Sequence, residues 1–237
     1  MRLIITFEPL EDFSYEEISK HMVQGFIYSL LKTKDNDFSK IHDSKKFKFF
    51  CFSDIFPVSD FKNEEAKMLL VSSPNKNFIK ALAESLRCAE VLKLGSHEIY
   101  VKDIKEVNLK LKNRFISGSP IVLYKDNKKN LYYSFKRDRN VEFFIKRLEE
   151  NAVKKFNAFY SDNYSLEERI FDKLKFKKEV SIENVKNNRK FIIIGSVWSL
   201  LEKFHIKRED RKFYEFIMDC GLGEKNSFGF GFINPIR

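Results

Sequence analysis

Near its C-terminus the chain concentrates residue types that could hold an anion. Residues 221–232 read GLGEKNSFGFGF, in which four glycines surround a Lys-Asn-Ser core. Glycine permits positive φ angles and close approach of another backbone, and successive main-chain N–H groups can then surround a phosphate. The alternative is a glycine-rich hairpin before a last strand, which needs no ligand. The candidate binding residues are Gly221, Gly223, Lys225, Asn226, Ser227, Gly229 and Gly231.

The pattern differs from both standard nucleotide-phosphate loops. No Lys-Ser/Thr pair follows a GxxxxG spacing, and no strand-loop-helix context surrounds the glycines. We therefore expect no nucleotide cofactor, and no other cofactor is indicated.

Net charge favours a polyanionic partner. The formal charge is +10, and residues 121–237 contribute 25 basic and 17 acidic side chains, against 19 and 17 in residues 1–120. An excess of +8 on the half that carries the glycine-rich loop suits a nucleic acid, because each phosphate neutralised releases counterions. The alternative is a lysine-rich surface that serves solubility.

Metal-assisted chemistry is not indicated by the ligand spacing. The four histidines form no HxxxH pair, and the three cysteines form no CxxC pair; we expect Cys51, Cys88 and Cys220 to be buried thiols. A phosphodiester could then be cut only by side chains. Such cleavage needs a proton-transfer group, a positioned partner and a cation at the phosphorane.

His42 is the best-placed histidine for that work. It follows a polar segment and precedes Lys45, Lys46 and Lys48, which would lower its pKa or hold a phosphate beside it. The alternative is an ordinary loop histidine. A rival is His21, which we expect to be a surface or interface residue beside the apolar stripe of a helix.

Predicted strands and helices must position these candidate site residues. The first half of the sequence predicts a strand, a helix, two strands, a second helix and a last strand, in that order. The expected ranges are 3–7, 14–32, 47–52, 67–72, 75–87 and 100–109, with Ser14 and Glu17 forming a capping box for the first helix.

The second half repeats this order with an added hairpin. Strands are expected at 116–124, 131–135, 171–179, 190–200 and 230–235, and helices at 139–158 and 208–220. The fold class is therefore α+β, with two tandem ferredoxin-like βαββαβ domains at 1–111 and 112–237.

Three segments together resemble the CRISPR repeat-processing endoribonuclease family, a group of repeat-associated RNA-binding proteins. They are the glycine-rich segment, QGFIYSLLK at residues 24–32 and IHDSKKFKFFCFS at residues 41–53. The resemblance implies a double ferredoxin-like fold and metal-independent cleavage of repeat RNA. In that reaction the ribose 2′-OH attacks the adjacent phosphate and leaves 2′,3′-cyclic phosphate and 5′-OH ends.

Carried over by position, the resemblance places the family's histidine at His42, its helix tyrosine at Tyr28 and its lysine at Lys48. Lys45 and Lys46 are alternatives for the lysine. The implied partner is precursor repeat RNA, with an interference ribonucleoprotein complex as a further one. The alternative function is a non-catalytic RNA-binding subunit of such a complex.

The remaining expectations concern location and assembly. The apolar stretch at residues 191–197 is about a third of a bilayer span, and the N-terminus turns acidic at Glu8. We therefore expect a cytoplasmic protein without a membrane partner, present as a monomer or homodimer.

Overall fold

The structure, a computed structural model, describes residues 1–32, 38, 47–186 and 189–236. The chain divides into two compact units. The first is Met1–Leu109 with Ser227–Gly229, and the second is Lys110–Asn226 with Phe230–Arg237. The short segment Ser227–Gly229 thus packs with residues more than a hundred positions away.

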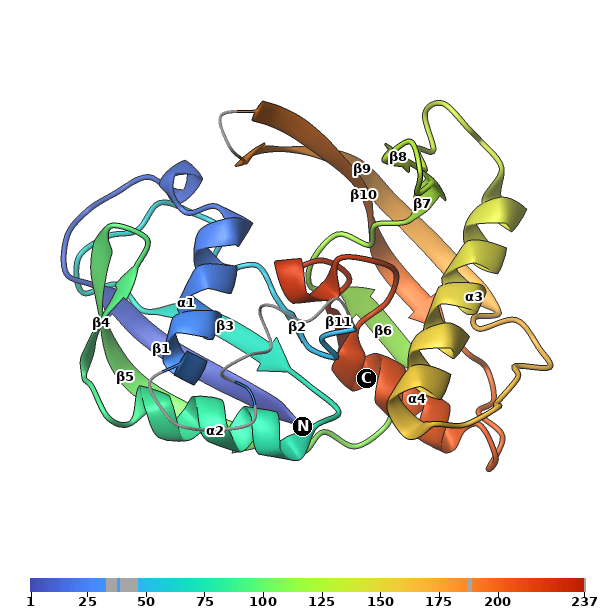
Figure 1. The fold of residues 1–237 in the computed structure, drawn as a ribbon, viewed down its shortest axis with the longest axis horizontal. Helices are drawn as coiled ribbons and strands as arrows, with labels where there is room; N and C mark the ends of the chain where they lie inside the picture. Colours follow the sequence, from blue (N-terminus) through green and yellow to red (C-terminus); the bar gives the residue numbers. More distant parts are fainter. Residues whose placement is uncertain (33–37, 39–46, 187–188, 237) are drawn as a thin grey trace. The chain divides into compact units, whose positions relative to one another are not determined.

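In its described residues the first unit contains a five-stranded sheet and two α-helices (Figure 1). Its elements are β1 (Arg2–Pro9), α1 (Lys20–Lys32), β2 (Cys51–Phe52), β3 (Lys67–Ser72), α2 (Lys76–Leu86), β4 (Val91–Leu94) and β5 (His97–Val107). The strand order is β2-β3-β1-β5-β4 and all pairs are antiparallel. Without the edge strand β4, this is the ferredoxin-like βαββαβ plan.

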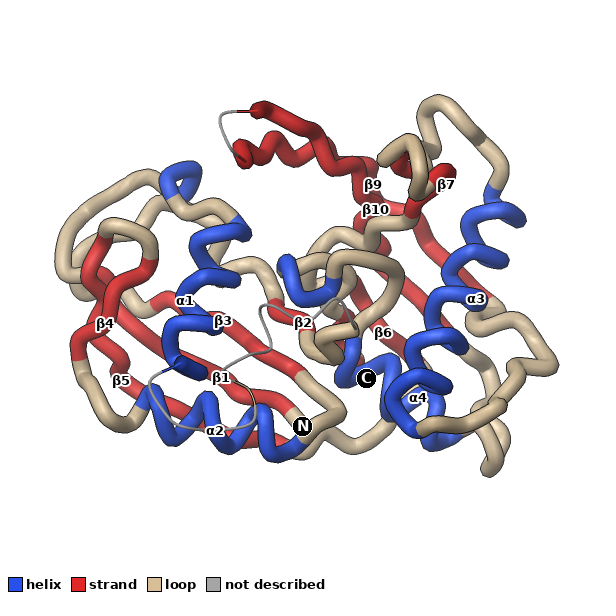
Figure 2. Tube along the Cα trace, viewed as in Figure 1, coloured by secondary structure: helices blue, strands red, loops and turns tan. Residues whose placement is uncertain are grey.

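The second unit repeats the plan. Its elements are β6 (Arg114–Ser117), β7 (Tyr124–Asp126), β8 (Leu131–Tyr132), α3 (Val141–Tyr160), β9 (Lys173–Lys186), β10 (Arg189–Glu202), α4 (Arg211–Cys220) and β11 (Ile233–Pro235). The sheet order β11-β6-β10-β9 corresponds, strand for strand, to β5-β1-β3-β2 of the first unit, and its long strands β9 and β10 lie side by side (Figure 2). The strands β7 and β8 form a separate two-stranded sheet. The predicted α+β fold of two ferredoxin-like domains is confirmed.

The start of α1 differs from the prediction. Ser14 and Glu17 do form a capping box, but it closes a 3-10 turn at Tyr15–Glu17. Ile18 is extended, with φ −98° and ψ 98°, so the chain leaves the turn and α1 begins only at Lys20. The predicted capping box is confirmed, and the prediction of one continuous helix from residue 14 was wrong.

Two other expectations were wrong. The strand expected at 116–124 ends at Ser117, because Pro120 has no N–H for a ladder and the N–H groups of Gly118 and Ser119 donate to the Phe232 carbonyl. Cys88 is exposed, since it follows the last turn of α2 on the solvent side, whereas Cys51 and Cys220 are buried thiols.

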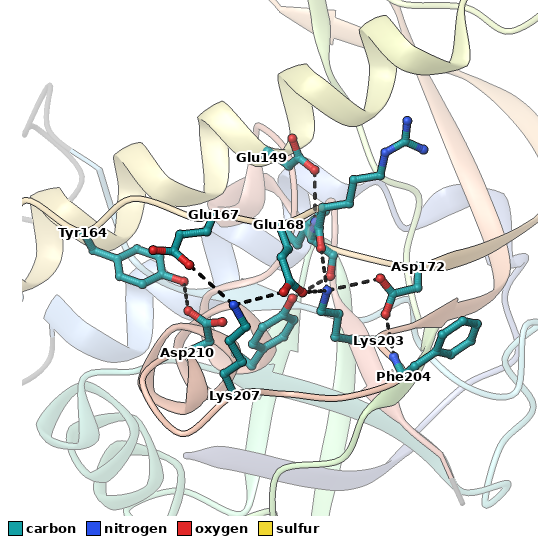
Figure 3. Close-up of polar contacts among 12 residues, drawn as sticks. Glu149, Tyr164, Glu167, Glu168, Asp172, Lys203, Phe204, Lys207 and Asp210 are labelled. Atoms are coloured by element: carbon teal, nitrogen blue, oxygen red, sulfur yellow. Dashed lines mark hydrogen bonds and ion pairs between the residues drawn. The ribbon is translucent and has the colours of Figure 1, made fainter.

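An ion-pair cluster fixes the end of β10 (Figure 3). The Lys203 side chain is buried, and its Nζ lies 2.9 Å from a Glu168 carboxylate oxygen and 3.1 Å from Asp172 Oδ1. Lys207 reaches the other oxygen of Glu168 at 3.0 Å. Asp172 also accepts the Phe204 N–H at 2.7 Å, so the backbone that leaves the strand is held as well.

This cluster predicts acid-sensitive stability. The hydrogen bonds from Lys203 and Lys207 lower the pKa of Glu168 from 4.5 to about 2. Because the pKa of Glu168 is lower in the folded state, its ion pairs add to the free energy of unfolding above pH about 4.5. This contribution is lost as the pH falls towards 2. Urea unfolding of wild type and Glu168→Gln across pH 2 to 7 measures it. The variant should lose less stability on acidification, and equal pH dependence would contradict the assignment.

Candidate functional site

A polar stripe on α1 faces the segment Ser227–Gly229. Lys20, Gln24 and Tyr28 are spaced by four residues, which places them on one face of the helix. Lys20 Nζ donates to the Gly229 carbonyl at 2.7 Å and pairs with Asp54 at 2.5 Å. Gln24 Nε2 donates to the Ser227 carbonyl at 2.7 Å.

Tyr28 lies at the end of this stripe. Its side chain is 7% exposed, and its ring meets the edge of Phe50 at a centroid distance of 5.9 Å. Burial raises the pKa of the Tyr28 phenol, while the neighbouring polar side chains of Ser227 and Gln24 oppose that rise. The phenol is therefore neutral near pH 7 and retains its proton.

The other two candidate catalytic residues are placed less completely. His42 lies outside the described residues, as do Lys45 and Lys46. Lys48 is described and half-buried. The rival His21 is exposed on α1, with its ring 6.0 Å from that of Phe228. The structure thus joins α1 to the segment Ser227–Gly229 through Lys20 and Gln24, and the catalytic roles of Tyr28, His42 and Lys48 stay predictions.

A lysine that sequence reasoning missed organises the other part of the glycine-rich loop. Lys155, on α3, is 3% exposed, and its Nζ donates to the carbonyls of Gly221 and Gly223 and to Asn226 Oδ1 at 2.7 to 2.9 Å. Asn226 Nδ2 in turn donates to the carbonyls of Leu222 and Phe230. The Asn226 side chain therefore holds the loop from inside.

Internal packing explains why three of these positions are glycine. Gly223, Gly229 and Gly231 have φ of 66°, 82° and 72°. A Cβ would lie 2.5 Å from the Val122 carbonyl oxygen at Gly223, 2.3 Å from the Phe52 ring at Gly229, and 1.8 Å from the Leu222 carbonyl oxygen at Gly231. The glycines thus shape the loop, whatever it binds.

Lys225 is the cation that the loop presents. It adopts φ 60°, and its Nζ lies 5.5 Å from the Tyr124 ring centroid and 5.8 Å from that of Tyr132. The two rings stack at 4.7 Å, so they support the Lys225 side chain over a rigid aromatic surface.

Two negative findings concern the part of the chain that the structure describes. Within it, no three His, Cys, Asp or Glu side chains gather as metal ligands. None of its helices combines the length and the apolar character needed to cross a bilayer.

Comparison with known proteins identifies the family. Residues 102–235 match the model of the family described as CRISPR associated protein Cas6, C-terminal. The chain belongs to the Cas6 family. It is 49% identical to "CRISPR-associated endoribonuclease Cas6 2" of Methanocaldococcus jannaschii, with all of both chains covered.

Solved structures show the same fold. One described as "CRISPR associated protein Cas6" has a TM-score of 0.74 and 23% identity, and the alignment covers 100% of this chain and 99% of that one. Another, described as "An RAMP protein binding different RNA substrates", has a TM-score of 0.72 and 21% identity, with both chains covered completely. The resemblance expected from three short segments is confirmed as family membership.

Proposed function

We propose that this Cas6 family member is a metal-independent endoribonuclease that cleaves CRISPR precursor RNA within its repeats. The observation that carries the proposal is the full-length 49% identity to a protein named as a CRISPR-associated endoribonuclease. The hydrogen bond from Gln24 to the Ser227 carbonyl adds support, because it joins two of the three resembling segments in one compact unit.

The proposed reaction is attack of a ribose 2′-OH on the adjacent phosphate. His42 would accept the 2′-OH proton or donate one to the leaving 5′-oxygen, and Lys48 would stabilise charge on the phosphorane. Tyr28, which is a neutral phenol, would donate a hydrogen bond. In-line placement of the 2′-OH supplies several kcal/mol more, and the products are 2′,3′-cyclic phosphate and 5′-OH ends.

RNA would be held by the glycine-rich loop. Lys225 is the proposed phosphate contact, supported by its place over the Tyr124 and Tyr132 rings. Gly221, Gly223, Gly229 and Gly231 would keep the backbone close to the RNA, and Asn226 and Ser227 would fix the loop shape. The +8 charge of residues 121–237 supports a phosphate-rich partner.

The partner would be repeat RNA in the precursor transcript, with a larger interference ribonucleoprotein complex as a further assembly. The relative described as an RNA-binding RAMP protein supports RNA as the ligand class.

Cleavage in excess EDTA tests the proposal. Because no ligand cluster is apparent in the sequence, repeat RNA should be cut at a rate within about twofold of that in magnesium. The 3′ ends should carry a cyclic phosphate, which resists end-labelling until it is opened. Loss of cleavage in EDTA with recovery in magnesium would contradict the metal-free mechanism. RNA binding without cleavage in either buffer would favour a non-catalytic RNA-binding subunit.

A further inference from the structure

An exposed phenylalanine stands among lysines on β9, the strand at one edge of the second unit's four-stranded sheet. Residues 173–178 read KLKFKK, and Phe176 is 42% exposed. The four lysines of this run are also exposed: Lys173, Lys175, Lys177 and Lys178. Among the residues that the structure describes, no carboxylate forms an ion pair with any of these four.

Aromatic neighbours hold the Phe176 ring in place. Its centroid lies 4.8 Å from that of Phe135 and 5.6 Å from that of Trp198. Phe135 is itself fixed, because its N–H and the Ser134 hydroxyl donate to the two carboxylate oxygens of Glu179 at 2.6 and 3.1 Å. The carboxylate that follows the lysine run therefore serves this aromatic cluster, and the Phe176 ring is supported while part of it stays open to solvent.

A β-bulge interrupts the strand at this ring. Trp198 pairs with Phe176 and Val197 pairs with Lys178, which leaves Lys177 as an extra residue in β9. A bulge bends its strand, redirects the side chains beside it and occurs often next to functional sites. The regular ladder that another strand would need is broken at the same place.

Protection of the sheet edge explains only part of this surface. Lysines on an edge strand oppose pairing with another chain, so they need no ligand. An exposed aromatic ring in their midst works against that protection, because it favours association. A supported ring flanked by cations is instead the arrangement that binds single-stranded nucleic acid, in which a base stacks on the ring and the adjoining phosphates meet the cations.

We propose that Phe176 is a stacking site for one base of a single-stranded segment of the RNA, and that Lys175, Lys177 and Lys178 contact the phosphates beside that base. The inference rests on the proposed function for RNA as the partner. The charge of the run complements phosphate and would repel an identical run on a second copy of the chain. Because every base has a π face, the site would add affinity without reading sequence.

The affinity of Phe176 variants for repeat RNA tests the stacking role. Phe176→Ala should weaken binding by about tenfold, and Phe176→Tyr, which keeps a ring, should bind as wild type does. Phe176→Leu keeps apolar contact with the aromatic cluster and should still lose affinity, which separates stacking from packing. The matched control is Phe204→Ala, since Phe204 follows β10 and is 66% exposed. It should bind normally.

Circular dichroism confirms that each of these variants is folded. Wild-type affinity in a folded Phe176→Ala or Phe176→Leu protein would overturn the stacking role. An equal loss in Phe204→Ala would overturn it as well, because the effect would then follow from removing any exposed ring.

A salt series tests the lysines separately. The double variant Lys177→Gln with Lys178→Gln should reduce the slope of log affinity against log salt by about 1.4, because each phosphate contact on a single strand contributes about 0.7. Phe176→Ala removes no charge and should leave the slope unchanged. The control is Lys76→Gln with Lys80→Gln, which removes two exposed lysines from α2. An unchanged slope in the first double variant, or an equal fall in the control, would overturn the phosphate contacts.

Trp198 supplies a readout that does not require cleavage. It is the single tryptophan of the chain, and its ring lies against that of Phe176. A short oligouridine should change its fluorescence, and Phe176→Ala should need about tenfold more RNA for the same change. Binding that depends on Phe176 in a protein that does not cleave would support the site and contradict the proposed endoribonuclease. Normal cleavage and binding by Phe176→Ala would overturn the site alone.

Light scattering examines the other occupant of this edge. Dimers that Phe176→Ala abolishes, together with unchanged RNA affinity, would assign the β9 surface to a second copy of the chain and overturn the proposal.

Discussion

Replacing His42 by alanine is expected to lower the rate of repeat cleavage by about 100-fold or more, with RNA affinity within a few-fold of wild type. A neutral phenol such as Tyr28 cannot accept the 2′-OH proton near pH 7, since burial raises its pKa. Lysine is protonated at that pH as well. The histidine is the group whose ordinary pKa suits proton transfer there, so its loss should affect the chemical step and spare binding.

His21→Ala is the matched control for this prediction. His21 is exposed on α1 and contacts the Phe228 ring, so it lies near the glycine-rich segment without being in the position that resembles the family's histidine. Single-turnover rates and RNA affinities of both variants decide between the two histidines. Normal cleavage by His42→Ala together with impaired cleavage by His21→Ala would show that the assignment is reversed.

Much of the fold could be predicted from local signals because each signal has a local physical cause. α2 lies inside its predicted range, since Asn75 caps it and its apolar residues recur at helical spacing. β3 has the predicted bounds. The hairpin of β4 and β5 was missed at β4, where the short run Val91–Leu94 is mostly exposed and shows no buried alternation.

The candidate site was less predictable because its key contacts join distant residues. Lys155 is one of 44 basic residues, and nothing in its neighbourhood distinguishes a buried ammonium from a solvated one. Gln24 stood within a segment that resembled the family, yet its partner Ser227 is 203 positions away. The glycines were recognised, but the atoms that exclude a side chain at Gly223 and Gly231 became apparent only in the structure.

Replacing Gly231 by alanine is expected to destabilise the second unit by about 3 kcal/mol or more. The new Cβ would lie 1.8 Å from the Leu222 carbonyl oxygen and 2.8 Å from Asn226 Nδ2, and φ of 72° is itself unfavourable for alanine. Backbone on both sides is fixed, because the Gly231 N–H donates to the Pro120 carbonyl and its own carbonyl accepts from Leu222. Relief of the clash would therefore displace Asn226 and the carbonyls that Lys155 holds.

Gly25→Ala is the control, because the same substitution is made there in a backbone that suits alanine and has space for its Cβ. Gly25 lies within α1 without a positive φ, and nothing stands within 4 Å of the position that a Cβ would take. Alanine there should stabilise the first unit by about 0.5–1 kcal/mol through helix propensity. Urea unfolding of both variants, followed by circular dichroism, measures the contrast. A Gly231→Ala protein as stable as wild type would show that the loop can rearrange, and that its glycines serve close approach of RNA more than internal packing.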